Sequence, residues 1–397
     1  MALLDDILNA YEFGEDAVLG TVVDLEGSGY RRPGARILIR TDGSHVGLIS
    51  GGCLEKDVAR HARARVADGP KTVTLDTRSN RLQPLGAYGT GCEGILRVLL
   101  QQLPVPAGRL DPLERLARLR EAGEPGVLAT VYDTTDSLNR TLGRAALVTD
   151  HDAHWDPEFG PELRGPLLEE AERTLGAQAT RGLRLEVGGA ALSVLLEYVA
   201  PPVELVIVGD GRDAAALVEL AVQMDWRVRV VGADPLRLEA SRFEEADTVC
   251  LEHPGDITSL ELHRHSYVVQ MTHDFQRDAR MLPGLLDSQA PYIGLLGPKR
   301  RAGRLMSALH ERGQLPDTSK LDKLAAPVGL DLGGDDPLEV ALSIISQVVA
   351  AKNGRRGAPL CEREDGIHDR HFVDEHSVDE NRVDHRQQRA DRAAKGA

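Results

Sequence analysis

The sequence predicts an α/β protein built from a mixed α+β N-terminal domain and a doubly wound, parallel-sheet C-terminal domain. The first observation is a series of short β-type runs, separated by glycine turns, that fills residues 18–103. The second is a change at residue 203, after which apolar strands alternate with amphipathic helices, the order typical of a helix-covered parallel sheet. The third is composition, because 42% of the 397 residues are hydrophobic, enough for each part to bury a core.

The N-terminal domain is expected over residues 1–105. Its predicted elements are strands at 18–27, 35–43 and from His45 to the Gly51-Gly52 turn, a helix at 54–68, and strands at 71–77 and 95–103 around a glycine-rich loop at 86–94. Asp42-Gly43 is a hairpin turn signal between two of these strands. Residues 106–200 read as a connecting α+β region, which is either a separate domain or part of the first.

The C-terminal domain is expected over residues 201–354. The run at 203–209 is almost continuously apolar, as a strand buried on both faces of a parallel sheet must be. Further predicted elements are a helix at 215–226, strands at 227–234, 247–253, 266–274 and 291–297, and a last helix that begins at Pro337 behind two aspartates. Residues 355–397 are rich in both signs of charge and poor in apolar periodicity, which predicts a disordered tail.

Bulk properties exclude several classes of function. A formal net charge of −15 argues against a nucleic-acid binder and against binding to acidic membranes. The N-terminus is acidic, and no run approaches the roughly 20 apolar residues of a membrane span, so we expect a cytoplasmic protein. Four cysteines lie far apart without a CxxC pair, which argues against a zinc finger, an iron–sulfur cluster and a disulfide framework.

A GxGxxA motif stands between a predicted strand and helix, at Gly209, Gly211 and Ala214. Its glycines permit a tight turn and close approach of a pyrophosphate, and this context predicts a Rossmann-type fold. Two features argue against a bound dinucleotide: Asp210 and Asp213 would repel a phosphate unless they point away, and Gly232 stands where an acidic residue usually binds the ribose. The displaced acid Asp234 could reach a ribose hydroxyl or cap the next turn, and both readings stay open.

Two further motifs end predicted strands of the same domain. Thr272-His273-Asp274 would lie at the carboxyl ends of the strands, where His273 beside an aspartate could act as a base or ligand. The alternative is local helix capping. Gly297 precedes a helix that starts with Lys299, Arg300 and Arg301, cations that a helix N-terminus disfavours unless an anion binds there; a solvated basic face is equally consistent.

The N-terminal domain carries a fourth group of motifs, in which cysteines stand beside glycines. These are the segments 27–34, 50–55 and 91–94, with Cys53 and Cys92. Glycine-rich turns expose backbone N–H groups to anions, and a cysteine at a helix start favours the thiolate. A buried cysteine can equally be a small hydrophobic residue. Cys250, in an apolar strand, is expected in the core, and Cys361 lies in the tail.

Taken together, these segments resemble the XdhC/CoxI family over nearly the whole ordered chain. The matching stretches are EGSGYRRPGARILIRTDGSHVGLISGGCLEKDV, the GCEG loop, VELVIVGDGRDAAALVELAVQMDWRVRVV, MTHDFQRD, YIGLLGPKRRAGRL and APVGLDLGGDDPLEVALSII. This sequence departs from the family pattern at three positions, with Asp210 for a small residue, Gly232 for an aspartate and Gln347 for an acid.

The resemblance implies a xanthine dehydrogenase accessory protein that binds molybdenum cofactor (molybdopterin), supports its sulfuration with a cysteine desulfurase, and hands it to an apo-molybdoenzyme of the xanthine dehydrogenase type. Such a chaperone has no turnover of its own. The resemblance carries cofactor-binding roles to Arg32, Ser50, Gly52, Cys53, Glu55, Cys92, Gly209, Gly211, Thr272, His273, Asp274, Gly297 and Arg300, and a metal contact to Cys53 and Cys92. Homo-oligomerisation is left open.

Two other functions compete with the chaperone. An NAD(P)-dependent oxidoreductase would use His273 as acid and base and would bind a nicotinamide cofactor, which Gly232 disfavours. A regulatory protein would bind a nucleotide and dock on a partner enzyme. Bound pterin, or bound NAD(P)H in its place, separates the three. The few cysteines and the length argue that the chain is not itself a xanthine dehydrogenase.

Overall fold

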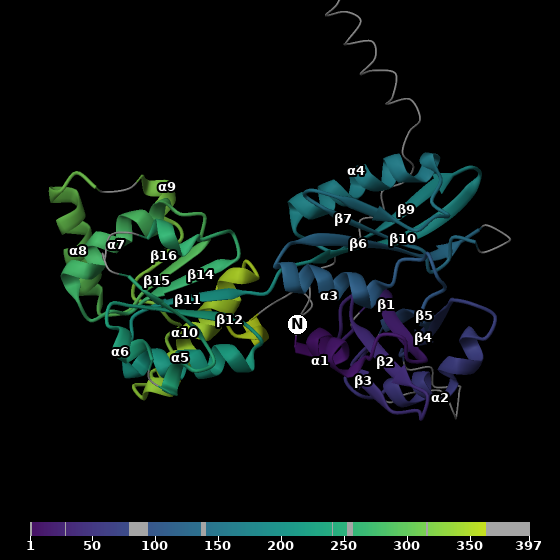
Figure 1. Cartoon of the computed structure of the whole chain (residues 1–397), viewed down its shortest axis with the longest axis horizontal. Coiled ribbons are helices and arrows are strands. Elements are labelled where there is room, and N and C mark those ends of the chain that lie inside the picture. The colour runs from purple at the N-terminus through teal and green to yellow at the C-terminus, as the bar shows by residue number, and fades with distance from the viewer. Residues whose placement is uncertain are drawn as a thin grey trace, which may run out of the picture. The chain divides into compact units, whose positions relative to one another are not determined.

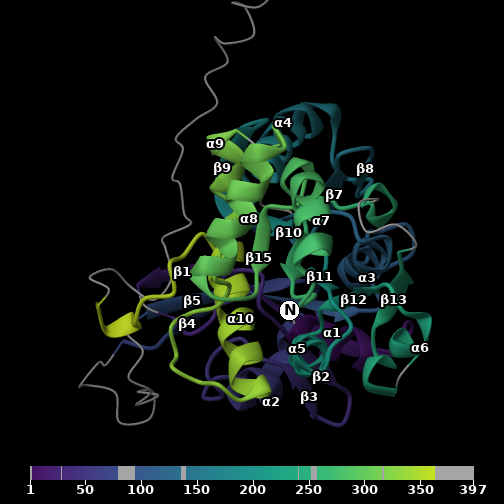
Figure 2. The same ribbon diagram turned by 90° about the vertical axis from the view of Figure 1, so that its left-hand side faces the viewer.

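The computed structural model describes residues 2–27, 29–78, 94–135, 140–239, 241–251, 257–314 and 317–362. These residues form two compact units, one of residues 2–200 and one that starts at Pro201 (Figures 1 and 2). The predicted disordered tail lies almost wholly outside the described residues, as do the glycine-rich loop around Cys92 and its GCEG motif.

The first unit contains two five-stranded antiparallel sheets of the same topology. The first sheet has the order β3-β2-β1-β5-β4 and the second β8-β7-β6-β10-β9. The strands are β1 (Ala17–Gly27), β2 (Arg36–Arg40), β3 (His45–Gly47), β4 (Lys71–Asp76), β5 (Gly94–Leu103), β6 (Gly126–Thr134), β7 (Ala145–Thr149), β8 (Ala153–Trp155), β9 (Arg181–Val187) and β10 (Ala190–Val199). Each sheet has one helix between its third and fourth strands, so the unit repeats one β-β-β-α-β-β pattern.

Among the described residues, four helices complete the first unit, and they explain why both faces of its strands are apolar. They are α1 (Ala2–Ala10), α2 (Glu55–Val66), α3 (Pro112–Ala122) and α4 (Pro161–Ala177). Along β1, Val18 and Val22 share a core with α2, whereas Leu19 shares a core with α1, α3 and the second sheet. Figure 1 shows the resulting order, with α2 and α4 outside the two sheets and α3 between them. Each sheet therefore buries its inner face only because the other sheet is present.

The two repeats contact each other through equivalent positions. Gly34 precedes β2 and Gly143 precedes β7; each has a positive φ and donates its N–H to the neighbouring strand, to Val22 and Val131. A Cβ on Gly34 would lie 2.9 Å from Glu197 on β10 of the second sheet. The reciprocal contact is made by Gln101 on β5, whose amide donates to the Gly143 carbonyl at 2.8 Å. These reciprocal contacts make the two halves a pseudo-symmetric pair.

The predicted elements of residues 18–103 are observed with small shifts in their ends. Strands 71–77 and 95–103 pair as β4 and β5, and the helix at 54–68 is α2. The duplication itself escapes sequence reading, because it resides in strand order and not in a repeated motif. The same compact unit contains residues 106–200 and the preceding residues.

The second unit confirms the doubly wound fold. Its six-stranded sheet has the order β13-β12-β11-β14-β15-β16, which is the 3-2-1-4-5-6 order of dinucleotide-binding folds. The strands, all parallel, are β11 (Glu204–Val208), β12 (Arg227–Gly232), β13 (Asp247–Cys250), β14 (Ser266–Gln270), β15 (Tyr292–Leu295) and β16 (Leu324–Ala325). Residues 204–208 are all buried, as the apolar run predicted.

Helices cover both faces of this sheet. They are α5 (Arg212–Gln223), α6 (Pro235–Leu238), α7 (Phe275–Asp287), α8 (Lys299–Glu311), α9 (Thr318–Leu321) and α10 (Pro337–Lys352), with short 3-10 turns at Ser241–Phe243, Thr258–Leu260 and Leu360–Glu362. Helices α5 and α10 share one core, and α7 and α8 lie on the opposite face (Figures 1 and 2). Helix α10 begins with the predicted Pro337 behind Asp336, which forms a capping box with Glu339.

The expectation that Cys250 belongs to the core is wrong. Its apolar neighbours in the sequence suggested a central strand, but β13 is an edge strand and pairs only with β12 among the described strands. Cys250 ends this edge strand and is exposed. An apolar run alone cannot distinguish a central strand from an edge strand, because strand order is a tertiary property.

A buried ion pair joins the two sheets of the first unit and supports a stability prediction. Arg36 on β2 donates two hydrogen bonds to Glu197 on β10, at 2.8 and 2.5 Å, and their side chains are 4% and 12% exposed. Arg36→Ala leaves the Glu197 carboxylate buried and unpaired, so we expect the free energy of unfolding to fall by about 3–5 kcal/mol. Urea unfolding of the full chain measures it.

The control is the exposed pair of Arg118 and Glu114 on α3, whose side chains are 63% and 41% exposed. Removing it by Arg118→Ala should cost no more than about 0.5–1 kcal/mol. Equal losses in the two variants would contradict a special role for the buried pair.

Candidate functional site

A glycine-rich loop between β3 and α2 surrounds a buried carboxylate. Glu55 is 1% exposed, and its oxygens accept hydrogen bonds from the Ser50 hydroxyl at 2.7 Å and from the backbone N–H groups of Ile49, Ser50 and Leu54 at 3.1, 2.8 and 3.1 Å. Ser50 Oγ in turn accepts from the N–H groups of Gly52 and Leu54, at 3.3 and 3.2 Å. Ser50 and Glu55 therefore shape the loop from within.

The protonation of Glu55 follows from this arrangement. Burial on its own raises the pKa of the Glu55 carboxyl, but the hydrogen bonds from Ser50 and from the Ile49 backbone outweigh burial and hold that pKa below its ordinary value of 4.5. The carboxylate is therefore charged at neutral pH, where it orders the loop.

Gly52 and Cys53 form the accessible tip of the loop. Both are exposed; Gly52 has a φ of +103°, and no atom lies within 4 Å of a Cβ built on it. The Cys53 thiol lies 3.5 Å from Ser50 Oγ. The expectation that Cys53 begins a helix needs correction, because α2 starts at Glu55 with Leu54 as its N-cap. Cys53 precedes the cap, so its thiol points from a loop and not from the first helical turn.

A second loop, between β1 and β2, meets the Gly51-Gly52 turn. A Cβ built on Gly51 would lie 3.7 Å from the ring of Tyr30, and the Arg31 guanidinium stacks on that ring at 5.5 Å. Tyr30 is 62% exposed and was not among the predicted site residues. The sequence feature that could have indicated Tyr30 is an aromatic residue inside a glycine-rich turn. Arg32 of the same loop is exposed, whereas Cys92 lies outside the described residues.

In the second unit, the structure brings two of the predicted motifs together at the point where the strand order reverses. The GxGxxA turn follows β11 and Thr272-His273-Asp274 follows β14, and these are neighbouring strands. Gly209 has a φ of +147°, and a Cβ there would lie 2.7 Å from the Met271 carbonyl oxygen. A Cβ on Gly211 would meet only His273, 3.9 Å from its Nε2. Ligands of such sheets bind at this switch point.

His273 is exposed over this turn and is paired differently from the prediction. Its Nε2 lies 3.7 Å from Asp213 Oδ2 on α5, and its φ is +50°. The neighbouring Asp274 is occupied as the N-cap of α7, because its carboxylate accepts from the N–H groups of Gln276 and Arg277. The capping alternative therefore applies to Asp274, while Asp213 is the carboxylate beside His273.

Thr272 belongs to a buried network beneath the site. Its hydroxyl donates to Asp278 at 2.5 Å, and Arg301 donates to the other oxygen of Asp278 at 2.5 Å. Asp278 is only 1% exposed. One member of the basic triplet at the start of α8 thus neutralises a buried aspartate. Lys299 and Arg300 remain exposed, and Gly297 turns the chain into α8 with a φ of +130°.

The two unusual residues Asp210 and Gly232 lie against each other. A Cβ on Gly232 would come within 3.0 Å of Asp210 Oδ2, so the Asp210 carboxylate occupies space beside the glycine at the end of β12. Arg237 lies 3.6 Å from this carboxylate. Asp234 caps α6 by accepting from the Leu236 N–H at 3.1 Å, which is the capping alternative. The two departures from the family pattern therefore lie side by side at the ends of β11 and β12.

Gln347, the third departure, holds the C-terminal helix to the sheet. Its Oε1 accepts from the Tyr292 hydroxyl at 2.6 Å and from the Gly329 N–H at 2.7 Å. Burial raises the pKa of the Tyr292 hydroxyl, which therefore stays a donor. In the described part of the chain, no group of three or more His, Cys, Asp or Glu side chains is arranged to hold a metal ion.

Comparisons with known proteins place the chain in a family. Residues 10–76 match the XdhC and CoxI family model, and residues 205–348 match the XdhC Rossmann domain. The chain belongs to the XdhC/CoxI family. The matched segments contain the Ser50–Glu55 loop and both switch-point motifs, so the predicted resemblance is confirmed.

Individual relatives of this XdhC/CoxI protein cover most of its length. It is 28% identical to a protein of Bacillus subtilis described as a probable subunit of xanthine dehydrogenase, over 88% of this chain and 96% of that one. It is 24% identical to the molybdenum cofactor insertion chaperone PaoD of Escherichia coli, over 85% and 84%. A Bacillus halodurans crystal structure described as a xanthine dehydrogenase superimposes with a TM-score of 0.68 at 28% identity, covering 89% of this chain and 96% of that one.

The described residues of this XdhC/CoxI protein include no helix with the length and apolar content needed to cross a membrane.

Replacing Glu55 tests the buried carboxylate. A group with a lowered folded pKa contributes stability above its unfolded pKa, and this contribution is lost as the pH falls through the folded pKa. Glu55→Gln should therefore lower the free energy of unfolding at pH 7 by about 1–3 kcal/mol. As the pH falls below about 4.5, the variant should also lose less stability than the wild type, because it lacks the titrating carboxyl. Urea unfolding from pH 7 to pH 3 measures both, and parallel curves for wild type and variant would contradict the assignment.

Gly209 and Gly211 in the second unit form a matched pair of positions for substitution. Gly209→Ala places a Cβ against a backbone oxygen at a φ that alanine avoids, so we expect a loss of about 2 kcal/mol or more. Gly211→Ala enters open space at a φ of −78° and should stay within about 0.5 kcal/mol of wild type. Urea unfolding followed by Trp226 fluorescence in a Trp155→Phe background measures both. Equal stability of the two variants would contradict the geometry of the turn.

Proposed function

We propose that this XdhC/CoxI protein is a molybdenum cofactor chaperone that takes part in maturation of a molybdoenzyme of the xanthine dehydrogenase type. The single observation that carries the proposal is the accessible Gly52-Cys53 tip, held by the buried Ser50–Glu55 pair. Family membership and the similarity to the insertion chaperone PaoD support it. The cofactor is cargo in this proposal, and the protein need not turn over a substrate.

The residues of the first unit suit an anionic cargo that contains sulfur-ligated molybdenum. Cys53 offers an exposed thiol, and thiolates are ligands for soft metal centres. Gly52 leaves open space above the loop, which lets a large ligand approach the backbone. Arg32 is exposed on the neighbouring loop and can bind a phosphate. Cys92 is proposed as a second thiol of the same site.

We also propose that sulfuration of the bound cofactor, with a cysteine desulfurase as the sulfur source, precedes its transfer to the apo-enzyme. An accessible thiol on a preformed loop can approach a partner, whereas a buried thiol could not. This step and the transfer would take place in the cytoplasm. Homo-oligomerisation is not required by any of these steps.

The second unit supports a competing ligand. The 3-2-1-4-5-6 strand order and the open space at Gly211 favour a nucleotide at the switch point, where Gly209, His273, Gly297 and Arg300 follow the strands or start the next helix. An NAD(P)-dependent oxidoreductase would use His273 as its acid and base. The Asp210 carboxylate beside Gly232 would repel a bound phosphate but can accept a hydrogen bond from a ribose hydroxyl.

Pterin retention separates these functions. The protein is purified from cells that make molybdenum cofactor and from cells that do not; bound pterin is measured by fluorescence, and transfer to apo-enzyme by the activity regained. The chaperone should retain pterin and activate the apo-enzyme. Binding of NAD(P)H without any retained pterin would overturn the chaperone and favour the oxidoreductase.

Cys53→Ala should weaken pterin retention by about tenfold or more, the scale on which metal sites lose affinity when a supporting group is removed. The fold should be unchanged, because the thiol is exposed. Cys250→Ala is the matched control, since Cys250 is also exposed but lies on the edge strand of the other unit. Unchanged retention in Cys53→Ala, or an equal loss in Cys250→Ala, would remove Cys53 from the site.

A further inference from the structure

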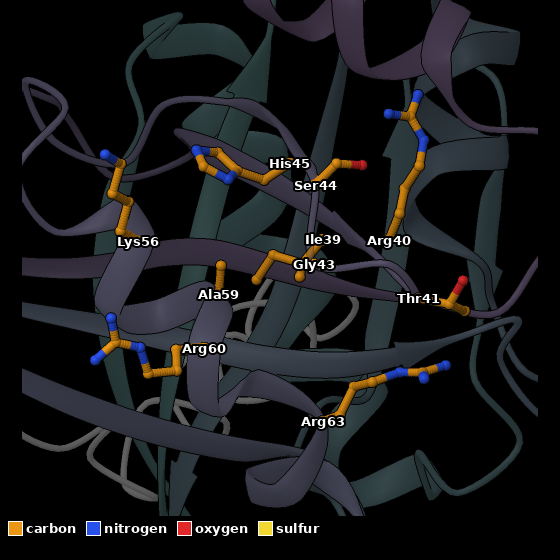
Figure 3. A pocket seen from close by; sticks show the side chains of 10 residues that line it. All are labelled: Ile39, Arg40, Thr41, Gly43, Ser44, His45, Lys56, Ala59, Arg60 and Arg63. Atoms are coloured by element: carbon orange, nitrogen blue, oxygen red, sulfur yellow. The ribbon is translucent and has the colours of Figure 1, made fainter.

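A basic pocket lies on the first unit, between α2 and the hairpin of β2 and β3 (Figure 3). It has a volume of about 640 Å³. Five of its lining side chains are basic, namely Arg40, His45, Lys56, Arg60 and Arg63, and none is a carboxylate. Concentrated positive charge of this kind is a local exception in a chain with a net charge of −15.

Three of these cations have no partner within the described chain. Lys56, Arg60 and Arg63 follow one another at helical spacing along α2, are exposed, and make no hydrogen bond or ion pair with any described residue. Like charges at this spacing repel and destabilise a helix. The protein therefore maintains an unfavourable arrangement that a bound anion would relieve.

Two carboxylates, Asp42 and Asp57, adjoin the pocket residues in the sequence but do not line the pocket. Asp42, in the hairpin turn, accepts from the Ser44 N–H at 2.8 Å, and its pKa is lowered by the hydrogen bonds of Ser44. Asp57 on α2 lies 3.9 Å from His61. Arg40 is held in place by a 3.0 Å hydrogen bond to the Ala10 carbonyl. The Asp42 carboxylate keeps its negative charge and attracts Arg40, so the pocket cations without a carboxylate partner among the described residues are Lys56, Arg60 and Arg63 of α2.

The arrangement of the side chains indicates the shape of the missing anion. Figure 3 shows Ile39, Gly43 and Ala59 in the middle, with Lys56 and Arg60 to one side and Arg40 and Arg63 to the other. Ile39 is 2% exposed and gives the pocket a firm apolar floor. An uncharged centre between two groups of cations suits an organic ligand with charge at more than one point. The hydroxyls of Thr41 and Ser44 also line the pocket.

We propose that this pocket binds a phosphate-bearing organic anion of nucleotide size. Its volume lies within the roughly 300–1,000 Å³ of small-molecule sites, larger than a lone phosphate fills. Arginine forks and lysine ammonium groups are the usual phosphate ligands. The loop residues 50–53 do not line the pocket, so it is separate from the cofactor loop and goes beyond the chaperone function.

The test uses the full chain purified from cells that lack molybdenum cofactor, with ADP, pyrophosphate and inorganic phosphate as probes in calorimetry. ADP should bind more tightly than pyrophosphate or phosphate, with an affinity that falls as salt rises. Arg60→Gln/Arg63→Gln should weaken ADP binding by about tenfold or more, because each charge-assisted hydrogen bond contributes on that scale. Arg184→Gln, at an exposed position of β9 in the same unit, should leave ADP binding unchanged.

The outcomes are decisive in each direction. Circular dichroism and urea unfolding establish that the double variant is folded, and Arg60→Lys/Arg63→Lys should recover much of the binding. ADP binding that persists in Arg60→Gln/Arg63→Gln but is lost in Gly211→Ala belongs to the switch point and overturns the pocket. If Arg60→Gln/Arg63→Gln loses pterin retention together with ADP binding, the pocket belongs to the cofactor site, and the proposal of a separate ligand is overturned. If the wild-type chain does not bind ADP, the proposal is overturned. Slower cofactor transfer to apo-enzyme by Arg60→Gln/Arg63→Gln would then assign this surface to a protein partner.

Discussion

The first unit depends on the mutual burial of two sheets that have the same topology. Each sheet covers its outer face with its own helix, but its inner face is apolar and is buried only by the other sheet and by α1 and α3. The Arg36–Glu197 pair and the Gln101–Gly143 contact set how the two repeats meet, because both are polar contacts inside an apolar interface. Polar groups in such a position must find their partners, so they specify a unique arrangement.

The repeats have diverged where the function is proposed. The loop before α2 holds glycines and an exposed thiol around the Glu55 carboxylate. The corresponding loop before α4 also buries a carboxylate, Asp156, which accepts from the N–H groups of Leu110 and Ala145 at 2.6 and 2.9 Å. There the carboxylate ties two segments of the core together and leaves no open glycine tip. A buried carboxylate thus stabilises the core in the second repeat and supports the accessible Gly52-Cys53 tip in the first.

In the second unit, the order of the strands determines where the candidate site lies. Reversal of the order between β11 and β14 brings two turns that are about 60 residues apart in the chain next to each other. Asp210 and Gly232 are neighbours in the fold, since a Cβ at 232 would lie 2.8 Å from Leu238 and 3.0 Å from the Asp210 carboxylate. The buried Thr272–Asp278–Arg301 network then fixes the loop that carries His273.

Local sequence by itself determined the strands of residues 18–103, the helix at 54–68, the start of α10 at Pro337, the GxGxxA turn and the doubly wound class of the second unit. These follow from side-chain periodicity and from backbone preferences of glycine and proline, which act over a few residues. Tertiary structure alone decided the duplication in the first unit, the exposure of Cys250, the pairing of His273 with Asp213, and the role of Glu55 as a scaffold. Each of these depends on which distant segments bury one another or on how a loop folds around one buried group, and a local pattern does not contain that information.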